Sequence, residues 1–368
     1  MLFGINSKYI LKKIFEFTEQ HKYLEIIKHN KKIQNLLQIT IKDYELVYKD
    51  YNQIEIDLIA TENLVSKESL LNNYYKENKP HINYLTNKNE FNFRVKIDSE
   101  VKSLEGIFEN QFYLKEVNFI KFNRKNFTNM SRMFNMCINL KKLNIQILKT
   151  DNVTTMKQMF SSCLSLEEIS VPKLNTSKVI DISHMFYNCK SLKELDVSNF
   201  NTSNAENMDY MFYGCASLKK LNLLSFNTSK VTSFKRMFDG CKELKELIIS
   251  NFDTSNIKEM DWMFCNCKSL ENINVSNFNT SNATNLSAMF YKCESLKELD
   301  ISNFNMKNVE NVGEMFKGCI SLNKLKMDIS NFIVDKIKNL KGMFKDCSKE
   351  LISKIKEENK NIKEEAFI

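Results

Sequence analysis

Apolar residues recur along most of the chain with one fixed period. Met-Phe pairs stand 26 residues apart, and a last pair follows after 28 residues. A cysteine stands four residues after each of these methionines, which are Met133, Met159, Met185, Met211, Met237, Met263, Met289, Met315 and Met343. A period of about 20 to 50 residues is typical of repeat proteins, in which each unit buries its apolar face against the next. The sequence therefore predicts a repeat fold.

The first half of each repeat predicts a short strand. After the cysteine, the spacing Leu-x-x-Leu-x-Leu, as at Leu218, Leu221 and Leu223, alternates apolar and polar side chains. This alternation is typical of a strand with one buried face. A segment rich in Asn, Ser and Thr follows, as at residues 199–204, and predicts a turn.

The second half of each repeat predicts a helix. The residue before the cysteine is Gly or Asn in five of nine repeats, as at Gly214, which favours a left-handed cap where a helix ends. The apolar residues of this half fall at helical spacing and form one face, as in Ala205, Met208, Met211, Phe212 and Cys215.

These elements predict an α/β repeat fold, a right-handed solenoid with a parallel β-sheet on one face, since strand crossovers are nearly always right-handed. The solenoid is expected over residues 91–347, with about nine to ten coils. One of them, at 101–126, keeps the apolar register but has no cysteine. Residues 1–90 are expected to form a small helical N-terminal region, and residues 348–368 a C-terminal capping helix.

Composition and charge limit the classes of partner and the location that we expect for the protein. The net charge of +8 is spread along the chain without a basic run, so no nucleic acid is expected as a partner. No apolar stretch reaches about 18 residues, so no transmembrane segment is expected. The first residues do not resemble a secretory signal, which favours a cytoplasmic location.

The repeat motif carries a family resemblance. The pattern M-F-x-x-C-x-S-L-x-x-L-x-V-S-N-F-N-T-S-N-V-x-x-M, seen almost intact from Met185 to Met208, resembles the BspA-type leucine-rich repeats of bacterial, mollicute and protist surface proteins. The resemblance implies a leucine-rich-repeat solenoid that binds proteins and has no catalytic residues. Members are often exported or lipid-anchored, so display at the cell surface is the alternative that the resemblance implies.

The N-terminal residues carry a second resemblance, to an F-box-like helical motif. It rests on residues 7–37. The matching residues are Ile10-Leu11, Ile14-Phe15, Phe17, Leu24 and the run from Asn30 to Leu36. The usual Leu-Pro opening and the Trp near the end are missing. The resemblance implies docking to a Skp-like ubiquitin-ligase subunit. The other interpretation is a helical cap whose Ile and Leu side chains pack on each other.

Neither the cysteines nor the histidines predict catalysis. One cysteine per repeat lacks the close paired spacing of a zinc site, so buried structural thiols are expected. Cys265 alone is out of register and is expected to be the most exposed thiol. The four histidines lie in unrelated registers and form no Ser-His or Cys-His pair. We expect no metal, no cofactor and no enzyme activity.

Two surfaces are candidates for partner binding. The first is the outward face of the strands, where Leu224 and Ile248 are expected to form a small apolar patch within a polar, mildly acidic rim: Glu194, Asp196, Asn222, Leu224, Glu246, Ile248, Asn274, Glu298 and Asp300. The second is a set of aromatic residues outside the buried register on the helix side: Tyr187, Tyr210, Tyr213, Trp262 and Tyr291.

The function predicted from these features is that of a non-catalytic scaffold which binds a partner protein through the solenoid surface. An F-box-like substrate adaptor of a ubiquitin ligase and a surface adhesin for a host or matrix protein are the alternatives.

Overall fold

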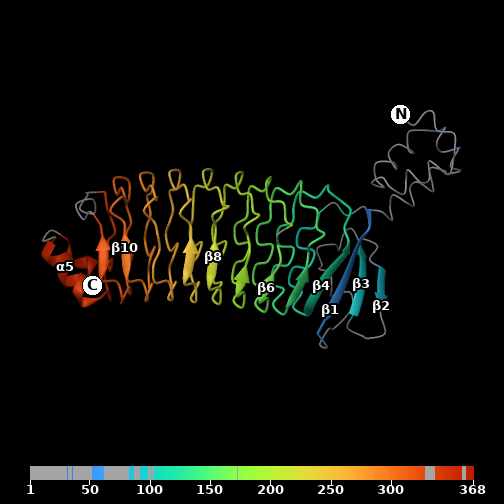
Figure 1. The fold of residues 1–368 in the computed structure, drawn as a ribbon, viewed down its shortest axis with the longest axis horizontal. Coiled ribbons are helices and arrows are strands. Elements are labelled where there is room, and N and C mark those ends of the chain that lie inside the picture. Colours follow the sequence, from blue (N-terminus) through green and yellow to red (C-terminus); the bar gives the residue numbers. More distant parts are fainter. Residues whose placement is uncertain are drawn as a thin grey trace.

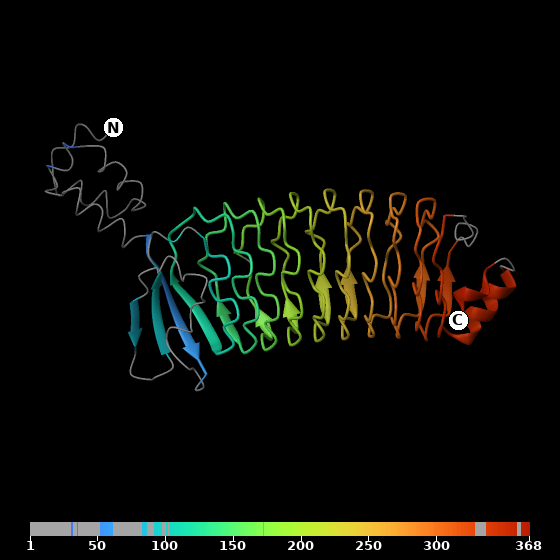
Figure 2. The same ribbon diagram turned by 180° about the vertical axis from the view of Figure 1, so that it is seen from behind.

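The computed structural model describes residues 31, 35, 52–61, 83–86, 92–97, 101, 103–171, 173–327, 336–358 and 362–368. Figures 1 and 2 show successive coils stacked in one elongated row, with the short strands along one long edge. The F-box-like segment lies outside the described residues, apart from Lys31 and Asn35.

The row begins with a five-stranded sheet in the order β2-β3-β1-β4-β5. Its strands are β1 (Ile54–Ala60), β2 (Asn83–Thr86), β3 (Asn92–Ile97), β4 (Leu114–Lys121) and β5 (Lys142–Asn144). β1 pairs antiparallel with β3 and β4, whereas β4 and β5 are parallel. The expectation of a helical region over residues 1–90 is therefore wrong for β1 and β2, because alternate β1 side chains are buried in strand geometry.

Further strands come in parallel pairs rather than in one continuous sheet. In each pair every residue faces the one 26 positions later, as in Leu221 opposite Leu247 and Leu299 opposite Leu325. The pairs are β6 (Glu168–Ile169) with β7 (Glu194–Leu195), β8 (Lys220–Asn222) with β9 (Glu246–Ile248), and β10 (Glu298–Asp300) with β11 (Lys324–Lys326).

The prediction of a helix in each coil is wrong. Over residues 205–215 the chain makes tight turns, and Tyr210 and Gly214 both have positive φ, at 57° and 68°. Alternate turn N–H groups donate to the next coil, as Phe212 does to the carbonyl oxygen of Met237 at 3.0 Å, while those between them close tight turns within their own coil, as Tyr213 does with Tyr210 at 3.1 Å. Two left-handed residues four positions apart recur in the other coils, so helical hydrogen bonding cannot continue through them.

The core is a set of columns that run along the row. A column of phenylalanine rings extends from Phe108 to Phe344, with ring centroids 5.4–5.8 Å apart. Beside it, each cysteine of the repeat donates its thiol hydrogen to the phenylalanine carbonyl of the preceding coil, at 3.0–3.3 Å. Burial raises the pKa of these thiols, that of Cys189 to about 12, so they stay protonated donors. Cys265, expected to be exposed, is buried as well.

A column of buried threonines adds polar links between coils. The Thr202 hydroxyl donates to the carbonyl oxygen of Asn227 at 2.9 Å and accepts the N–H of the same residue at 2.8 Å. Buried threonines occupy this position in Thr150, Thr176, Thr202, Thr228, Thr254 and Thr280.

Asn and Asp side chains form the corners of the coils. Within one coil, Asp196, Asn201 and Asn207 each accept the N–H of the residue two positions later, at 2.9–3.1 Å. These Asx turns account for the Asn-rich segments, since such side chains stabilise tight turns without a helix.

The last coil is covered by the C-terminal segment. After α5 (Lys349–Glu358), the chain returns through the short 3-10 helix η4 (Glu364–Ala366). Gly342 and Phe344 donate their N–H groups to Glu365 and Ala366 at 2.7 and 2.8 Å, as they would to a further coil. The ring of Phe367 stacks on Phe344 at 5.8 Å and ends the phenylalanine column.

We predict that Phe212→Ala lowers the free energy of unfolding by about 3–5 kcal/mol, because the ring lies between Phe186 and Phe238 at 5.8 and 5.7 Å and its loss leaves a cavity. Urea denaturation measures the loss. Exposed Glu194→Ala is the control and should change stability by less than about 0.5 kcal/mol. Similar losses in both variants would contradict the assignment of the core.

We also predict that Thr202→Val destabilises the protein by about 1–3 kcal/mol, because it removes both partners of the Asn227 backbone without changing the side-chain shape. The exposed Thr232→Val is the matched control, and the same urea experiment should show little change. Equal midpoints for the two variants would exclude a stabilising role for the threonine column.

Candidate binding surfaces

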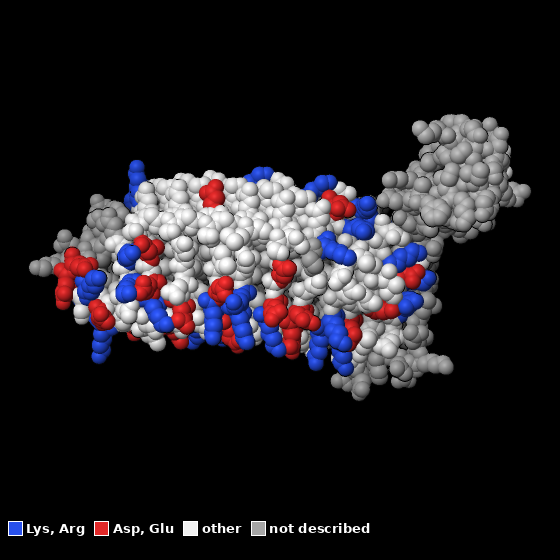
Figure 3. All heavy atoms as spheres, viewed as in Figure 1, with Lys and Arg blue, Asp and Glu red and all other residues white. Residues whose placement is uncertain are grey.

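The strand-face candidates lie at the surface. Glu194, Asp196, Asn222, Leu224, Glu246, Asn274 and Glu298 are exposed, while Ile248 and Asp300 are half-buried. Figure 3 shows Lys, Arg, Asp and Glu gathered in a band along the edge that carries the strands, beside a wide area with few charges.

Ion pairs between neighbouring coils occupy much of this band. Lys220 and Glu246 are 2.7 Å apart and remain 76% and 50% exposed. Lys193 donates to Glu167 at 2.6 Å and lowers the pKa of that carboxyl group, and Lys297 makes the same contact with Glu271. Exposed pairs of this kind contribute at most about 1 kcal/mol each. Several charges in this band thus pair with each other across neighbouring coils.

The apolar candidates Leu224 and Ile248 lie at different register positions in adjacent coils. Ile248 ends β9 and faces Asn222 in register, whereas Leu224 follows the end of β8 and is 53% exposed. The two side chains therefore occupy different positions in their coils.

A groove of about 540 Å³ interrupts the strand face at residues 272–274. It brings together the candidates Glu246, Asn274, Glu298 and Asp300. Sequence reasoning missed Lys245, Lys324 and Lys326, which also line it. The available signal was the pair Asn272 and Asn274, which places short side chains in two adjacent columns of the same coil.

The aromatic candidates gather in two groups on the turns. In the first, Tyr187 stacks on Tyr213 at 4.7 Å and 8°, and His184 stacks on Tyr210 at 4.6 Å and 14°. Tyr210 and Tyr213 lie 5.8 Å apart and join the two stacks.

The second group centres on the single tryptophan. The Arg236 guanidinium lies 4.3 Å above the Trp262 ring, and Tyr291 lies 5.6 Å from the same ring. His184 and Arg236 were not among the sequence candidates. Their signal was their position directly before the Met-Phe pair, which they share with Tyr210 and Trp262.

Buried polar atoms occur in His184 and in the residues directly before His184 and Trp262. Among the described residues, Ser183 Oγ, His184 Nδ1 and Asp261 Oδ1 are buried without a hydrogen-bond partner. Burial, and secondarily the charge of Lys157, lowers the pKa of His184, although Asp181 opposes the shift. Burial also raises the pKa of Asp209 and Asp239.

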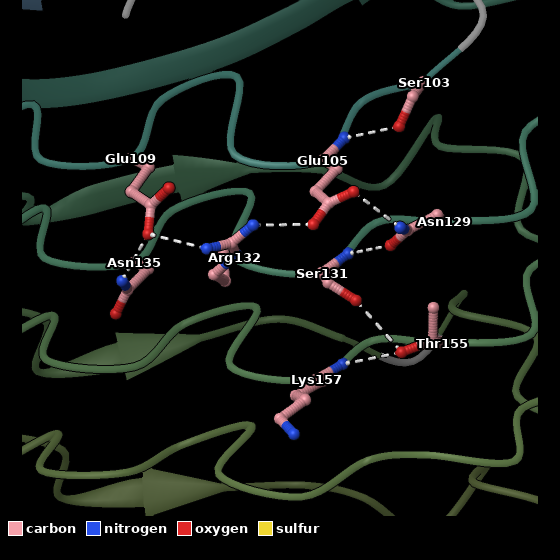
Figure 4. A network of polar contacts seen from close by, with 9 residues as sticks. All are labelled: Ser103, Glu105, Glu109, Asn129, Ser131, Arg132, Asn135, Thr155 and Lys157. Carbon is pink, nitrogen blue, oxygen red and sulfur yellow. Dashed lines mark hydrogen bonds and ion pairs between the residues drawn. The ribbon is translucent and has the colours of Figure 1, made fainter. Parts of the chain in front are cut away.

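The same turn position has a structural role in the first coils. There Arg132 donates to Glu105 at 2.7 Å, and Asn135 donates to Glu109 at 2.9 Å (Figure 4). These contacts join the coil without a cysteine to its neighbour. At this turn position, polar contacts link the first coils, whereas stacked rings occupy it from His184 onward.

In the part of the chain that the structure describes, no group of three or more His, Cys, Asp or Glu side chains is placed to hold a metal ion. No helix there is long and apolar enough to cross a membrane.

Comparison with known proteins identifies one family. The model of the family described as "Mycoplasma protein of unknown function, DUF285" matches residues 82–170, 102–223, 163–249, 215–324 and 241–357. No curated protein and no solved structure matches the chain.

The half-buried His184 predicts a pH-dependent stability. Its folded pKa lies below the unfolded value of about 6.5, so its contribution is full above that pH and is lost as the pH falls below it. His184→Gln should remove this contribution, and Gln158 already occupies the equivalent position one coil earlier. Urea unfolding from pH 7.5 to 5 should show the wild type losing more stability than the variant; parallel curves would contradict the assignment.

Proposed function

The chain belongs to the family described as Mycoplasma protein of unknown function, DUF285, and from that premise we propose that it is a non-catalytic scaffold which binds another protein. The binding site that we propose is the aromatic turn face, defined as His184, Tyr187, Tyr210, Tyr213, Arg236, Trp262 and Tyr291.

The composition of the aromatic turn face carries the proposal. Tyr, Trp and Arg are the side chains that contribute most binding energy at protein interfaces, whereas Lys and Glu are depleted there. Along the strands, by contrast, lysines and glutamates of neighbouring coils already pair with each other, as Lys220 does with Glu246. This contrast favours the turns over the strands as the main contact.

Pre-organisation adds to the argument. The stacks of Tyr187 on Tyr213 and His184 on Tyr210 hold the rings in place before any partner arrives. Ordering a free side chain on binding costs about 0.5–1.5 kcal/mol, and this cost is small for a ring that is already fixed.

The repeat architecture supports a binding role as well. We infer that the coils form a right-handed solenoid of leucine-rich-repeat type, as the resemblance to BspA-type repeats implies. In such a solenoid the buried columns carry stability, and outward residues are free to vary with the partner. The thiols offer no nucleophile in this proposal, because burial raises the pKa of Cys189 and its equivalents and thiolate is the reactive form.

The test is crosslinking pull-down of full-length protein from native cells, read by mass spectrometry and followed by affinity measurement with the purified partner. The aromatic variant is Tyr187→Asn, Tyr210→Gln, Tyr213→Ser, which installs residues found at the same positions in earlier coils: Asn135, Gln158 and Ser161. We expect affinity to fall at least about tenfold.

The control for this test is the strand-face variant Glu194→Ala, Glu298→Ala, with folding of both variants checked by urea midpoint. If the strand-face variant loses the partner and the aromatic variant keeps it, the proposal is wrong. A ligase subunit among the captured partners would favour the adaptor alternative, and a host or matrix protein the adhesin.

A further inference from the structure

We propose that the polar corner of the first five coils is a second binding surface, which binds to the anionic surface of a lipid membrane. The polar corner consists of five equivalent Asn-rich segments at residues 121–128, 147–154, 173–180, 199–206 and 225–232. In Figure 1 the arrowheads of β8 and β10 point toward the long edge opposite the strand band, so the residues after each strand lead to that edge. This surface is separate from the aromatic turn face.

Basic residues outnumber acidic ones in the polar corner. Its basic residues are Lys121, Arg124, Lys125, Lys149, Lys173, Lys178 and Lys230, and its acidic residues are Asp151 and Glu206. The equivalent segments of the next three coils, at residues 251–258, 277–284 and 303–310, hold two basic and two acidic residues. The positive excess therefore belongs to the first five coils. The repeat gathers these lysines on one edge, although the sequence contains no basic run.

The lysines of the polar corner keep their charge because their neighbours are neutral. Lys178 Nζ donates to the carboxamide oxygen of Asn152 at 2.6 Å, and Lys230 Nζ makes the same contact with Asn204 at 2.6 Å. A carboxamide has no charge to offset the ammonium group, in contrast to the glutamates that pair with lysines along the strands.

Three further lysines of the polar corner have no side-chain partner at all. Within the described part of the chain, Lys125, Lys149 and Lys173 are exposed and form neither a hydrogen bond nor an ion pair through their side chains. Arg124 differs, since it is buried, lies 4.3 Å from the Phe127 ring and donates to the Val101 carbonyl oxygen. The charge that a partner meets on this edge is therefore carried by lysines.

Exposed aliphatic side chains lie among these lysines. Ile180 belongs to the polar corner and is 45% exposed. Ile120 and Leu224 directly precede its first and last segments and are 40% and 53% exposed. The same two columns hold polar residues at the other described positions, such as Thr232 and Ser250. Positive charge and exposed aliphatic side chains therefore coincide in the same five coils.

This combination selects an anionic membrane as the partner. Lysines near a membrane are attracted by the negative surface potential of anionic lipids, and aliphatic side chains enter the boundary between headgroups and acyl chains. An acidic peptide would match the lysines and leave the aliphatic side chains in water. Single-stranded nucleic acid is recognised by stacking on exposed aromatic rings, whereas the rings of Phe122, Phe200 and Phe226 are buried here.

The test is cosedimentation of the full-length protein with phosphatidylcholine vesicles that contain about one third phosphatidylglycerol, compared with vesicles of phosphatidylcholine alone. At low salt we expect at least about tenfold tighter binding to the anionic vesicles. Raising NaCl to about 1 M, where the Debye length is about 3 Å, should remove most of this difference.

Two variants with the same change of net charge locate the binding. The corner variant should bind the anionic vesicles at least about tenfold more weakly, and it is Lys125→Gln, Lys149→Gln, Lys173→Gln. The control should bind them less than about twofold more weakly, because it removes exposed lysines outside the polar corner: Lys190→Gln, Lys219→Gln, Lys242→Gln.

A second pair of variants tests the aliphatic contact. Ile180→Thr with Leu224→Ser installs residue types found at the same positions one coil or more away, and should weaken binding at least about threefold. Met136→Ser with Ile320→Ala removes two other exposed apolar side chains and should leave binding unchanged.

Equal weakening by the two lysine variants would overturn the proposal, because the effect would then be one of net charge alone. Equal binding to neutral vesicles would exclude anionic lipid as the partner, and full binding by the Ile180→Thr, Leu224→Ser variant would exclude insertion. If a Glu-rich peptide or an oligonucleotide bound through the same lysines while the vesicles did not, the partner would be a soluble polyanion and the proposal would be wrong. Urea midpoints check that every variant folds.

Discussion

Hydrogen bonds between the backbones of successive coils are the constraint on which the rest of the structure depends. The N–H of Phe212 donates to Met237, and equivalent residues repeat this contact one coil later. A turn that points its donors outward has no partner within its own coil, so a neighbour must supply the acceptor. Extra residues are accommodated only outside the paired turns, as in the last coil, where the spacing is 28 residues and Phe316 still donates to Met343 at 2.9 Å. The 26-residue spacing is therefore a consequence of backbone pairing, and the side-chain columns follow from it.

Columns form outside the core for the same reason. Because equal positions stack, a lysine meets a glutamate one coil away, as in Lys220 and Glu246, and a tyrosine meets a tyrosine, as in Tyr187 and Tyr213. In a regular column the side chains contact each other, so few of their charges and ring faces remain for a partner protein. Distinct surface sites arise where a column changes character, which occurs at Asn272 and Asn274 on the strands and from His184 onward on the turns.

Sequence reasoning predicted the repeat, the strands and the inward phenylalanines and cysteines, because these depend on spacing alone. The helix prediction failed because apolar positions such as Met208, Met211 and Cys215 fit a helix and a double turn equally well. The helix and the double turn differ in that the turn contains residues with left-handed backbone. Tyr210 is one of these residues, and a tyrosine in the sequence does not indicate positive φ. Cys265 was misplaced because neither its burial nor its contact with Asp239 of the preceding coil follows from spacing along the chain. The groove was missed because its sequence signal, the pair Asn272 and Asn274, becomes a hollow only once neighbouring coils stack beside it.

The aromatic turn face combines local strain with stacking. His184, Tyr210, Arg236 and Trp262 have φ of 52–62°, which costs about 1–2 kcal/mol for a residue with a side chain. Glycine avoids this cost and occupies the position in the last coil, at Gly342. Stacked rings return about 0.5–1.5 kcal/mol per pair beyond their burial, which roughly offsets the strain. Stability therefore gives little reason to prefer rings over glycine at this position. The proposed binding to a partner would supply such a reason, because a glycine has no side chain for a partner to recognise.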